Sequence, residues 1–206
     1  MYCTLTDLKT YLGITGTAGT GTGTTGDETG DDALLTDLLA SAQALIDRHC
    51  GRTFEAAADA TRYYTVGVDT IGRTLFLDRD LCQITSVITN ADADDGGTTL
   101  TDADYTTRPR NETPYHAIVL RLSSDAVWEY TVDPEDGIAV TGRWAWSVTA
   151  PDDIVQACRR AAAWLYRQKD AQVFDVTAQV ATGAVTIRQE LPRDVRDLLE
   201  PYVRRI

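Results

Sequence analysis

Histidine is scarce in this chain of 206 residues, and the usual means of acid–base catalysis near neutral pH is scarce with it. The two histidines are His49 and His116, and histidine is the side chain whose ordinary pKa lies nearest to physiological pH. We expect His49 on the apolar face of a helix and His116 exposed in a turn. The glycine-flanked serine, Walker and zinc-protease motifs are also missing. No catalytic residue is therefore predicted, and we expect a protein that is not an enzyme.

Cysteine pairs with metal-binding spacing are missing too. The four cysteines, Cys3, Cys50, Cys82 and Cys158, lie far apart and form no C-x-x-C motif. We therefore predict no bound metal, no cofactor and no disulfide framework, and we expect folding in a reducing cytoplasm. No apolar run approaches the length of about 20 residues that a membrane helix needs, and the N-terminus lacks the layout of a signal peptide. We expect no membrane partner.

Positive charge is in short supply, with 19 Lys and Arg against 31 Asp and Glu and a formal net charge of −12. Ordinary nucleic-acid binding needs clustered basic side chains, so this balance argues against it. The excess acid lies almost entirely in residues 1–150, because residues 151–206 are near neutral. An acidic body with a near-neutral C-terminal quarter indicates two different neighbours. The basic residues of this quarter are Arg159, Arg160, Arg167, Lys169, Arg188, Arg193, Arg196, Arg204 and Arg205.

Two helices are predicted in the N-terminal part. Thr4 and Asp7 have the spacing of a capping box, and the leucines that follow form one apolar stripe that Gly13 ends. A stronger helix is predicted from Asp31 to Cys50, with acidic residues at its positive end. Its apolar face contains Leu35, Leu38, Leu39, Ala42, Leu45, Ile46 and His49.

Between these helices, residues 16–30 consist mostly of Gly and Thr. Such side chains offer little surface to bury, while the backbone loses much entropy when it is ordered. We therefore expect a mobile loop that becomes ordered only against a neighbouring chain.

The hydrophobic period changes to two near Arg62, which predicts antiparallel strands. Asp92–Gly97 is the clearest turn between them, and we interpret its three aspartates as solvated rather than as a calcium site, because the EF-hand pattern is absent. The predicted strands are Arg62–Val66, Thr74–Leu77, Ile84–Thr89, Tyr105–Arg108, Ala117–Leu122, Val127–Val132 and Ile138–Trp144.

Helical character returns at Pro151, which suits a first helical turn, and Ile154, Cys158, Ala161, Ala162 and Leu165 then follow on one side. Val173–Arg188 is compatible with a hairpin or an extended arm. A last helix is predicted over Pro192–Arg205, bent or ended near Pro201. Its apolar stripe needs a partner surface, because so short a helix is marginal by itself. We favour another subunit or a portal as that surface, with the chain's own core as the alternative.

The fold class predicted from this pattern is α+β. The N- and C-terminal parts are expected to form a helical bundle, into which an antiparallel β-sandwich or small barrel is inserted. The expected domains are residues 1–58 with the Gly/Thr loop, residues 59–148 as the β insertion, and residues 149–206 as the helices and arm that complete the bundle.

Tryptophans near the end of the β region give two interpretations. Trp144 and Trp146 have the spacing of one strand face, and with Trp128 they are compatible with a sugar-binding platform. An aromatic core or a subunit interface is the favoured interpretation. Together with the arginines and the last helix, the candidate interface residues are Arg159, Arg160, Arg167, Arg193, Arg196, Leu198, Leu199, Tyr202, Arg204, Arg205, Trp144 and Trp146.

Several segments resemble one family, the head-to-tail connector proteins of long-tailed bacteriophages. Leu5–Ile14 is similar to the opening helix of that family, and Asp32–Leu35 through Ile46–Phe54 is similar to its second helix, which is the most specific match. The other matching segments are Leu75–Leu81, Asn111 with Pro114-Tyr115, Gly137–Trp144, and Pro151–Ile154 with Ala157.

The resemblance implies a structural adaptor of the virion neck without catalytic residues. Such a subunit forms a ring of about twelve copies beneath the portal, lines a channel through which DNA passes without sequence-specific binding, and seats a stopper or tail protein. The implied location is the virion neck, after assembly in the host cytoplasm. Within the same biology the alternative is a stopper or tail-completion protein, and from a different class it is a carbohydrate-binding module.

Overall fold

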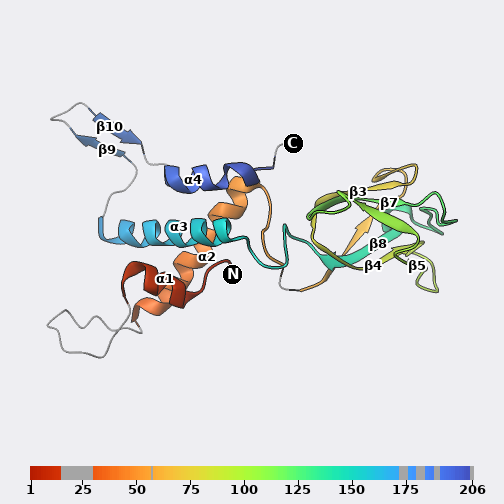
Figure 1. The fold of residues 1–206 in the computed structure, drawn as a ribbon, viewed down its shortest axis with the longest axis horizontal. Helices are drawn as coiled ribbons and strands as arrows, with labels where there is room; N and C mark the ends of the chain where they lie inside the picture. The colour runs from red at the N-terminus through yellow and green to blue at the C-terminus, as the bar shows by residue number, and fades with distance from the viewer. Residues whose placement is uncertain (15–29, 57, 172–175, 180–183, 188–190, 205–206) are drawn as a thin grey trace. The chain divides into compact units, whose positions relative to one another are not determined.

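The chain folds into two compact units, a helical unit of residues 1–51 and 151–206 and a β unit of residues 52–150 (Figure 1). The predicted α+β class is confirmed, since the described residues contain α-helices and antiparallel sheets. The computed structural model describes all residues except 15–29, 57, 172–175, 180–183, 188–190 and 205–206. It describes the backbone alone for residues 30, 169–171, 176–179 and 184–187. The Gly/Thr loop, apart from Gly30, therefore lies outside the described residues.

Helix α1 (Leu5–Leu12) begins and ends where the sequence predicts. The Thr4 hydroxyl accepts a hydrogen bond from the Asp7 amide at 3.1 Å, and the Asp7 carboxylate accepts one from the Thr4 amide at 3.4 Å. The bonds from the Thr4 hydroxyl and amide lower the pKa of Asp7. At the other end Gly13 has a φ of 74°, a left-handed conformation that glycine adopts without strain. The predicted capping box is confirmed.

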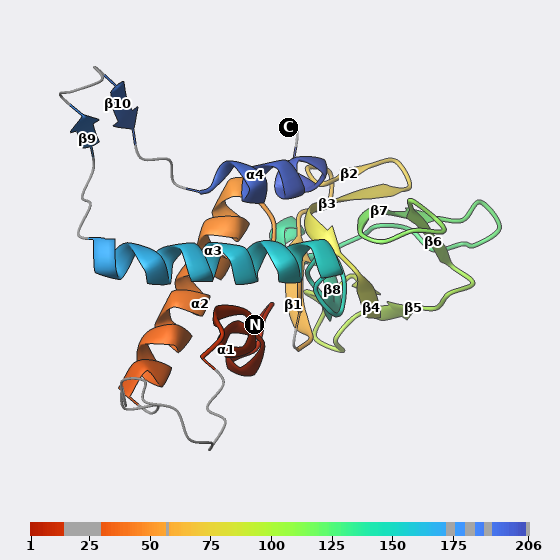
Figure 2. The same ribbon diagram turned by 60° about the vertical axis from the view of Figure 1, so that its left-hand side comes forward.

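The other helices of this unit are α2 (Gly30–Cys50), α3 (Asp152–Ala171) and α4 (Arg193–Leu199), which a short 3₁₀ turn (Glu200–Tyr202) extends. Helix α3 contacts α1, α2 and α4. Figures 1 and 2 show α3 between α1 and α4, with α2 crossing it. The unit is thus organised around α3.

Small side chains on α3 allow three helices to approach it closely. Ala157, Cys158, Ala161 and Ala162 are fully buried, and the distance between packed helices depends on the side chains at their contact. Larger side chains from the other helices fill the space around them. These buried residues are Leu8, Leu35, Leu39, Ala42, Ile46, Cys50, Val195 and Leu199.

One residue of the predicted α2 face is misplaced. His49 is exposed, and the buried face ends at Cys50 instead. Position 49 lies at one edge of the buried face, three residues after Ile46, and its side chain reaches solvent there.

Strands β9 (Val176–Gln179) and β10 (Ala184–Ile187) pair antiparallel after α3. Of the two alternatives for this segment, a hairpin-like pair is therefore the one observed. The rest of the segment lies outside the described residues.

The β unit contains two four-stranded sheets, each with antiparallel neighbours. Six of the seven predicted strands are present, five of them with shifted ends and Tyr105–Arg108 with the predicted bounds. The short strands β2 and β5 were not predicted. The first sheet, in spatial order, is β1 (Ala60–Tyr64), β8 (Ile138–Arg143), β4 (Gln83–Thr89) and β5 (Thr98–Leu100). The second is β2 (Thr70–Ile71), β3 (Thr74–Leu81), β7 (Tyr115–Leu120) and β6 (Tyr105–Arg108).

Both sheets contribute to one core. On β3, Leu75 and Leu77 are buried while Phe76 between them is 47% exposed, which is the alternation of a strand with one covered face. Gly142 lets β8 approach β4 closely, since a Cβ there would lie 2.2 Å from the Gln83 carbonyl oxygen. The buried cluster contains Tyr64, Leu75, Leu77, Leu81, Val87, Leu100, Tyr105, Ile118, Leu120, Trp128, Ile138 and Val140.

The predicted strand Val127–Val132 is wrong. The amides of Thr131, Val132 and Asp133 donate to the carboxylate of Asp92, so a side chain takes the place of a neighbouring strand. Val132 is 79% exposed, although its β-branched side chain favours a strand. The Asp92–Gly97 segment is a turn, as predicted, and Asp92 fastens it to residues 131–133.

The first prediction concerns the capping box of α1. Replacing Thr4 with Ala removes the acceptor for the Asp7 amide and should lower the free energy of unfolding of the helical unit by about 1 kcal/mol. Urea unfolding followed by far-ultraviolet circular dichroism measures this. Thr6→Ala is the matched control, because Thr6 is exposed within the same helix. Equal stability of the two variants would contradict the capping role.

The second prediction concerns Asp104 in the β unit. Its carboxylate accepts from the Ser124 hydroxyl at 2.6 Å and from the Thr101 hydroxyl at 2.7 Å and amide at 2.8 Å, which lowers its pKa to about 2. A lowered pKa stabilises the fold above the unfolded value of 3.8, and this contribution is lost as pH falls toward about 2. Asp104→Asn should therefore unfold at lower urea than the wild type at pH 6.

The difference in urea midpoint should shrink between about pH 4 and about pH 2, as the wild-type carboxylate is protonated. Asp125→Asn is the control, because Asp125 is exposed and forms no hydrogen bond with the described residues. A midpoint difference that stays constant down to pH 2 would show that the Asp104 charge does not stabilise the fold.

Candidate subunit interface

A hollow of about 190 Å³ lies on the helical unit, and we call it the helical groove. Residues of α3 form its floor, and α1 and α4 lie on either side of α3 (Figure 1). The lining residues are Tyr11 of α1, Arg160, Ala163, Trp164 and Arg167 of α3, and Pro192 and Asp194 at the start of α4.

The groove combines aromatic surface with positive charge. Tyr11 is 48% exposed, and Trp164 is half-buried. Arg160 donates to the Asp194 carboxylate at 2.9 Å and so ties α3 to α4. Arg167 is exposed and forms no ion pair with any residue that the structure describes. Aromatic and arginine side chains are enriched in protein interfaces, so this groove has the composition of a docking surface.

The structure brings together some of the candidate interface arginines and separates others. Arg160 and Arg167 line the groove, and Arg193 lies exposed between two lining residues, Pro192 and Asp194. Arg159 lies elsewhere on α3, where its side chain is near the Cys3 thiol.

Arg196 and Arg204 are half-buried, and the Arg204 amide donates to the Cys50 carbonyl at 2.9 Å. Arg205 lies outside the described residues. Within the described part, two arginines of the larger predicted set, Arg160 and Arg167, therefore line the groove, and Arg193 lies next to it in the sequence.

The apolar stripe of α4 faces the chain's own core. Leu199 and Val195 are fully buried within the helical unit, so the alternative of internal packing holds for them. Leu199 therefore packs inside the helical unit of the single chain. Leu198 is half-exposed, and Tyr202 is half-buried with its hydroxyl donating to the Asp153 carboxylate at 3.3 Å. These two remain on the surface of the unit.

The tryptophans of the β unit do not form a shared platform. Trp128 is only 9% exposed and belongs to the core. Trp144 follows the end of β8, donates to the Ala60 carbonyl at 2.8 Å and lies beneath the Arg62 guanidinium. Trp146 packs against other partners, Phe54 and the Arg52 guanidinium, 4.8 Å from its ring. The sugar-binding interpretation therefore loses its geometric basis.

The cysteines are buried thiols. All four are free, and burial raises the pKa of Cys158 to about 12 and raises that of Cys3 and Cys82. His116 is exposed, as predicted, but it lies in strand β7 and not in a turn. Across the described residues, no three His, Cys, Asp or Glu side chains gather closely enough to hold a metal ion. None of the described helices is long and apolar enough to cross a membrane.

Tyr11 and Trp164 are the aromatic groove residues that the sequence analysis missed. A signal for Trp164 was present, because Arg160, Trp164 and Arg167 are spaced by four and three residues and so share one helix face. No comparable signal exists for Tyr11, since only the packing of α1 on α3 brings it to the same hollow.

Two solved structures share the fold along the whole chain. A chain in the neck of an empty gene transfer agent particle, computed with C6 symmetry, is 16% identical with a TM-score of 0.56. A chain in the virion of a native gene transfer agent particle is 18% identical with a TM-score of 0.54. Each match covers 100% of this chain and 91% of the other. No protein-family model and no curated protein sequence matches.

The third prediction tests the internal packing of α4. Leu199→Ala removes a fully buried side chain and should lower the free energy of unfolding by about 2 to 5 kcal/mol. The neighbouring Leu198→Ala, at a half-exposed position, is the control and should cost less. Thermal or urea unfolding measures both. If Leu199→Ala kept wild-type stability, the stripe would not be part of the core.

Proposed function

We propose that this chain is a structural protein of the neck of a tailed-phage-like particle. In this role it is a head-to-tail adaptor that forms a ring between the portal and the next neck or tail protein. The observation that carries the proposal is the fold likeness over the whole chain to gene transfer agent particle chains, one of them from a neck. The segments that resemble phage head-to-tail connectors support it independently.

A ring requires two different surfaces on each subunit, because a head-to-tail contact joins unlike patches. The helical groove supplies one surface, with exposed positive charge at Arg167 and Arg193. The β unit supplies an opposite charge, since its acidic residues outnumber its basic ones two to one. We propose a ring of about twelve copies, a number compatible with the sixfold symmetry of the gene transfer agent neck.

The charge of the chain suits a channel through which DNA slides. Each phosphate that a protein neutralises adds affinity through counterion release, so many such contacts would hold the DNA in place. A net charge of −12 for each subunit limits these contacts. We therefore assign the arginines of the C-terminal part to protein partners, with the portal on one side and a stopper or tail protein on the other.

In this proposal the four helices act as the bundle that builds the ring, and the two sheets act as a sandwich-like insertion. The protein contributes surfaces and no chemistry, and it functions in the virion after assembly in the host cytoplasm. A carbohydrate-binding module is disfavoured, because Trp128 is buried in the core.

The fourth prediction tests the groove in assembly. Arg167→Glu reverses an exposed charge and should leave the fold intact, yet it should weaken ring formation and reduce the yield of tailed particles. Circular dichroism reports the fold, sedimentation velocity reports the ring, and electron microscopy of lysates counts heads without tails. Arg79→Glu is the matched control, with the same charge change at an exposed position of the β unit.

If the Arg167→Glu variant assembled like the wild type, the groove would not be part of the interface. Immunogold labelling places the chain within the particle. Label on the tail side of the neck, away from the portal, would favour a stopper or tail-completion protein over the adaptor.

A further inference from the structure

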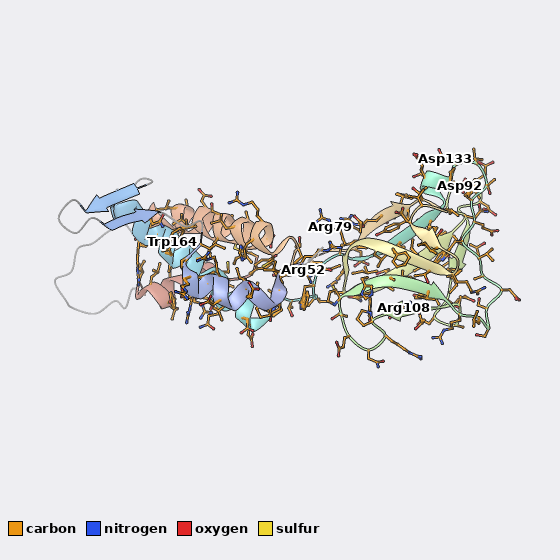
Figure 3. The ribbon with its side chains drawn as sticks, turned by 90° about the horizontal axis from the view of Figure 1, so that it is seen from above. Arg52, Arg79, Asp92, Arg108, Asp133 and Trp164 are labelled. Atoms are coloured by element: carbon orange, nitrogen blue, oxygen red, sulfur yellow. The ribbon has the colours of Figure 1, made fainter. Side chains whose placement is uncertain are left out.

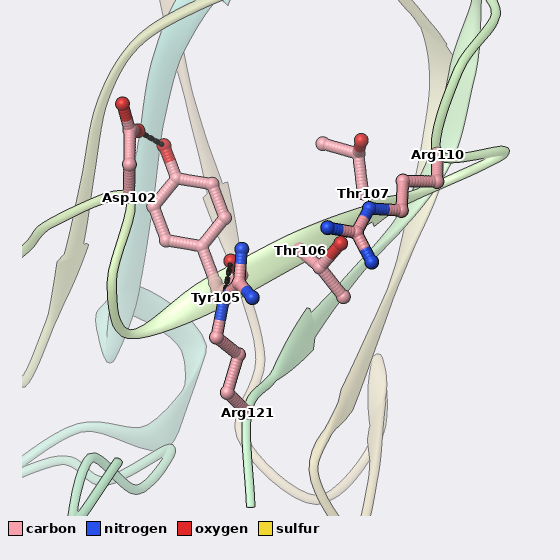
Figure 4. A pocket seen from close by; sticks show the side chains of 6 residues that line it. All are labelled: Asp102, Tyr105, Thr106, Thr107, Arg110 and Arg121. Atoms are coloured by element: carbon pink, nitrogen blue, oxygen red, sulfur yellow. Dashed lines mark hydrogen bonds between the residues drawn. The ribbon is translucent and has the colours of Figure 1, made fainter. Parts of the chain in front are cut away.

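A second hollow, of about 220 Å³, lies beside β6 in the β unit, and we call it the arginine hollow. Strand β6 is the edge strand of its sheet, so the hollow is open to another molecule. Its lining combines two arginines with hydroxyl groups, as Figure 4 shows. The lining residues are Asp102, Tyr105, Thr106, Thr107, Arg110 and Arg121.

Two guanidinium groups in this hollow have no carboxylate partner. The Arg121 Nε donates to the Tyr105 carbonyl at 2.8 Å, which orients the group and leaves its terminal nitrogens for another acceptor. Neither Arg110 nor Arg121 forms an ion pair with the described residues, whereas Arg62 and Arg143 of the same unit do. Figure 4 shows the Arg110 guanidinium near Thr106 and Thr107 and the Arg121 guanidinium near Tyr105.

Asp102, the carboxylate that lines the hollow, already accepts a hydrogen bond. The Tyr105 hydroxyl donates to the Asp102 carboxylate at 3.3 Å, and burial together with that carboxylate raises the pKa of Tyr105 to about 12. The tyrosine therefore stays protonated and keeps donating to Asp102. Two guanidinium groups and one carboxylate leave a single positive charge, which suits one monoanionic oxygen group.

A carboxylate fits the hollow better than a nucleic acid does. A guanidinium forms paired hydrogen bonds with a single carboxylate, and such a contact needs no wider basic surface. A nucleic acid presents a row of phosphates, which the acidic excess of the β unit repels. The chemistry therefore favours an acidic protein segment.

The same unit carries such a segment, which we call the acidic tip. It consists of the exposed residues Asp94, Asp95, Asp133, Glu135 and Asp136. Asp92 fastens the two loops of the tip to each other, through its bonds from the amides of residues 131–133. Figure 3 places Asp92 and Asp133 on the opposite side of the β unit from Arg108, the last residue of β6.

We propose that the arginine hollow of one copy binds a carboxylate of the acidic tip of a second copy. The two patches differ, so the contact is head-to-tail: it repeats from copy to copy and closes into a ring when its rotation allows. The inference rests on the proposed ring function and adds a β-to-β contact to it. Val132, 79% exposed beside the tip acids, supplies apolar surface at this contact.

The experiment is a charge swap in the full chain. Arg110→Glu alone, and Asp94→Arg with Asp95→Arg alone, should each raise the protein concentration needed for half-maximal association by about tenfold or more. Combining all three substitutions in one chain should restore association toward the wild-type value, because opposite charges then meet again. Sedimentation velocity measures association, circular dichroism checks the fold, and Arg79→Glu is the control.

Three outcomes would overturn the inference. They are a wild type that stays monomeric, single-site variants that associate normally, and a combined variant that shows no recovery. Binding of a short DNA duplex that Arg110→Glu abolishes, with association unchanged, would overturn it in favour of a phosphate site. If Arg110→Glu still joins heads to tails while Arg167→Glu does not, the adaptor function stands and this contact alone fails.

Discussion

The packing of α3 against α2 holds together two segments that the whole β unit separates in the sequence. Bringing distant segments together costs loop-closure entropy, and this cost grows only slowly with the length between them. Ordering residues 52–150 into their own core already limits the freedom of that loop. Burial of the α3 face that carries small side chains then offsets the remaining cost. Helices α1 and α4 pack on α3 once α2 has positioned it.

The helical groove is a consequence of that packing. Ala161 and Ala162 turn inward, and Arg160, Trp164 and Arg167, which share another side of α3, line the groove. Helices α1 and α4 then supply the walls, and the ion pair from α3 to α4 steadies one of them. An exposed ion pair of this kind contributes about 1 kcal/mol or less, so it orients more than it stabilises.

The β unit contains both paired charges and separate patches of surplus positive and negative charge. Arginines of the β unit pair with acids at Arg52, Arg62 and Arg143, yet Arg110 and Arg121 share a hollow without a carboxylate partner among the described residues. Surplus acid gathers in the turns at the tip, where water solvates it in a single copy. A subunit with separate surplus charges of both signs is suited to repeated head-to-tail contacts.

Local chemistry made several features predictable from the sequence. The capping box at Thr4 and the left-handed Gly13 depend on residues within one helical turn, and the helix from Asp31 to Cys50 depends on its own period. The change of period near Arg62 was enough to predict antiparallel strands. The arginine and tryptophan of the groove share a helix face, so their grouping was also present in the sequence.

Only the tertiary structure decided the features that depend on distant partners. Residues 127–132 have the composition of a strand, but the amides of residues 131–133 donate hydrogen bonds to the Asp92 carboxylate and not to a neighbouring strand. Leu198 and Leu199 are alike in sequence, and the position of α3 determines which one is buried. Hydrophobic periodicity predicts that one face of a helix or strand will be buried. Which segment packs on that face depends on contacts between residues far apart in the chain.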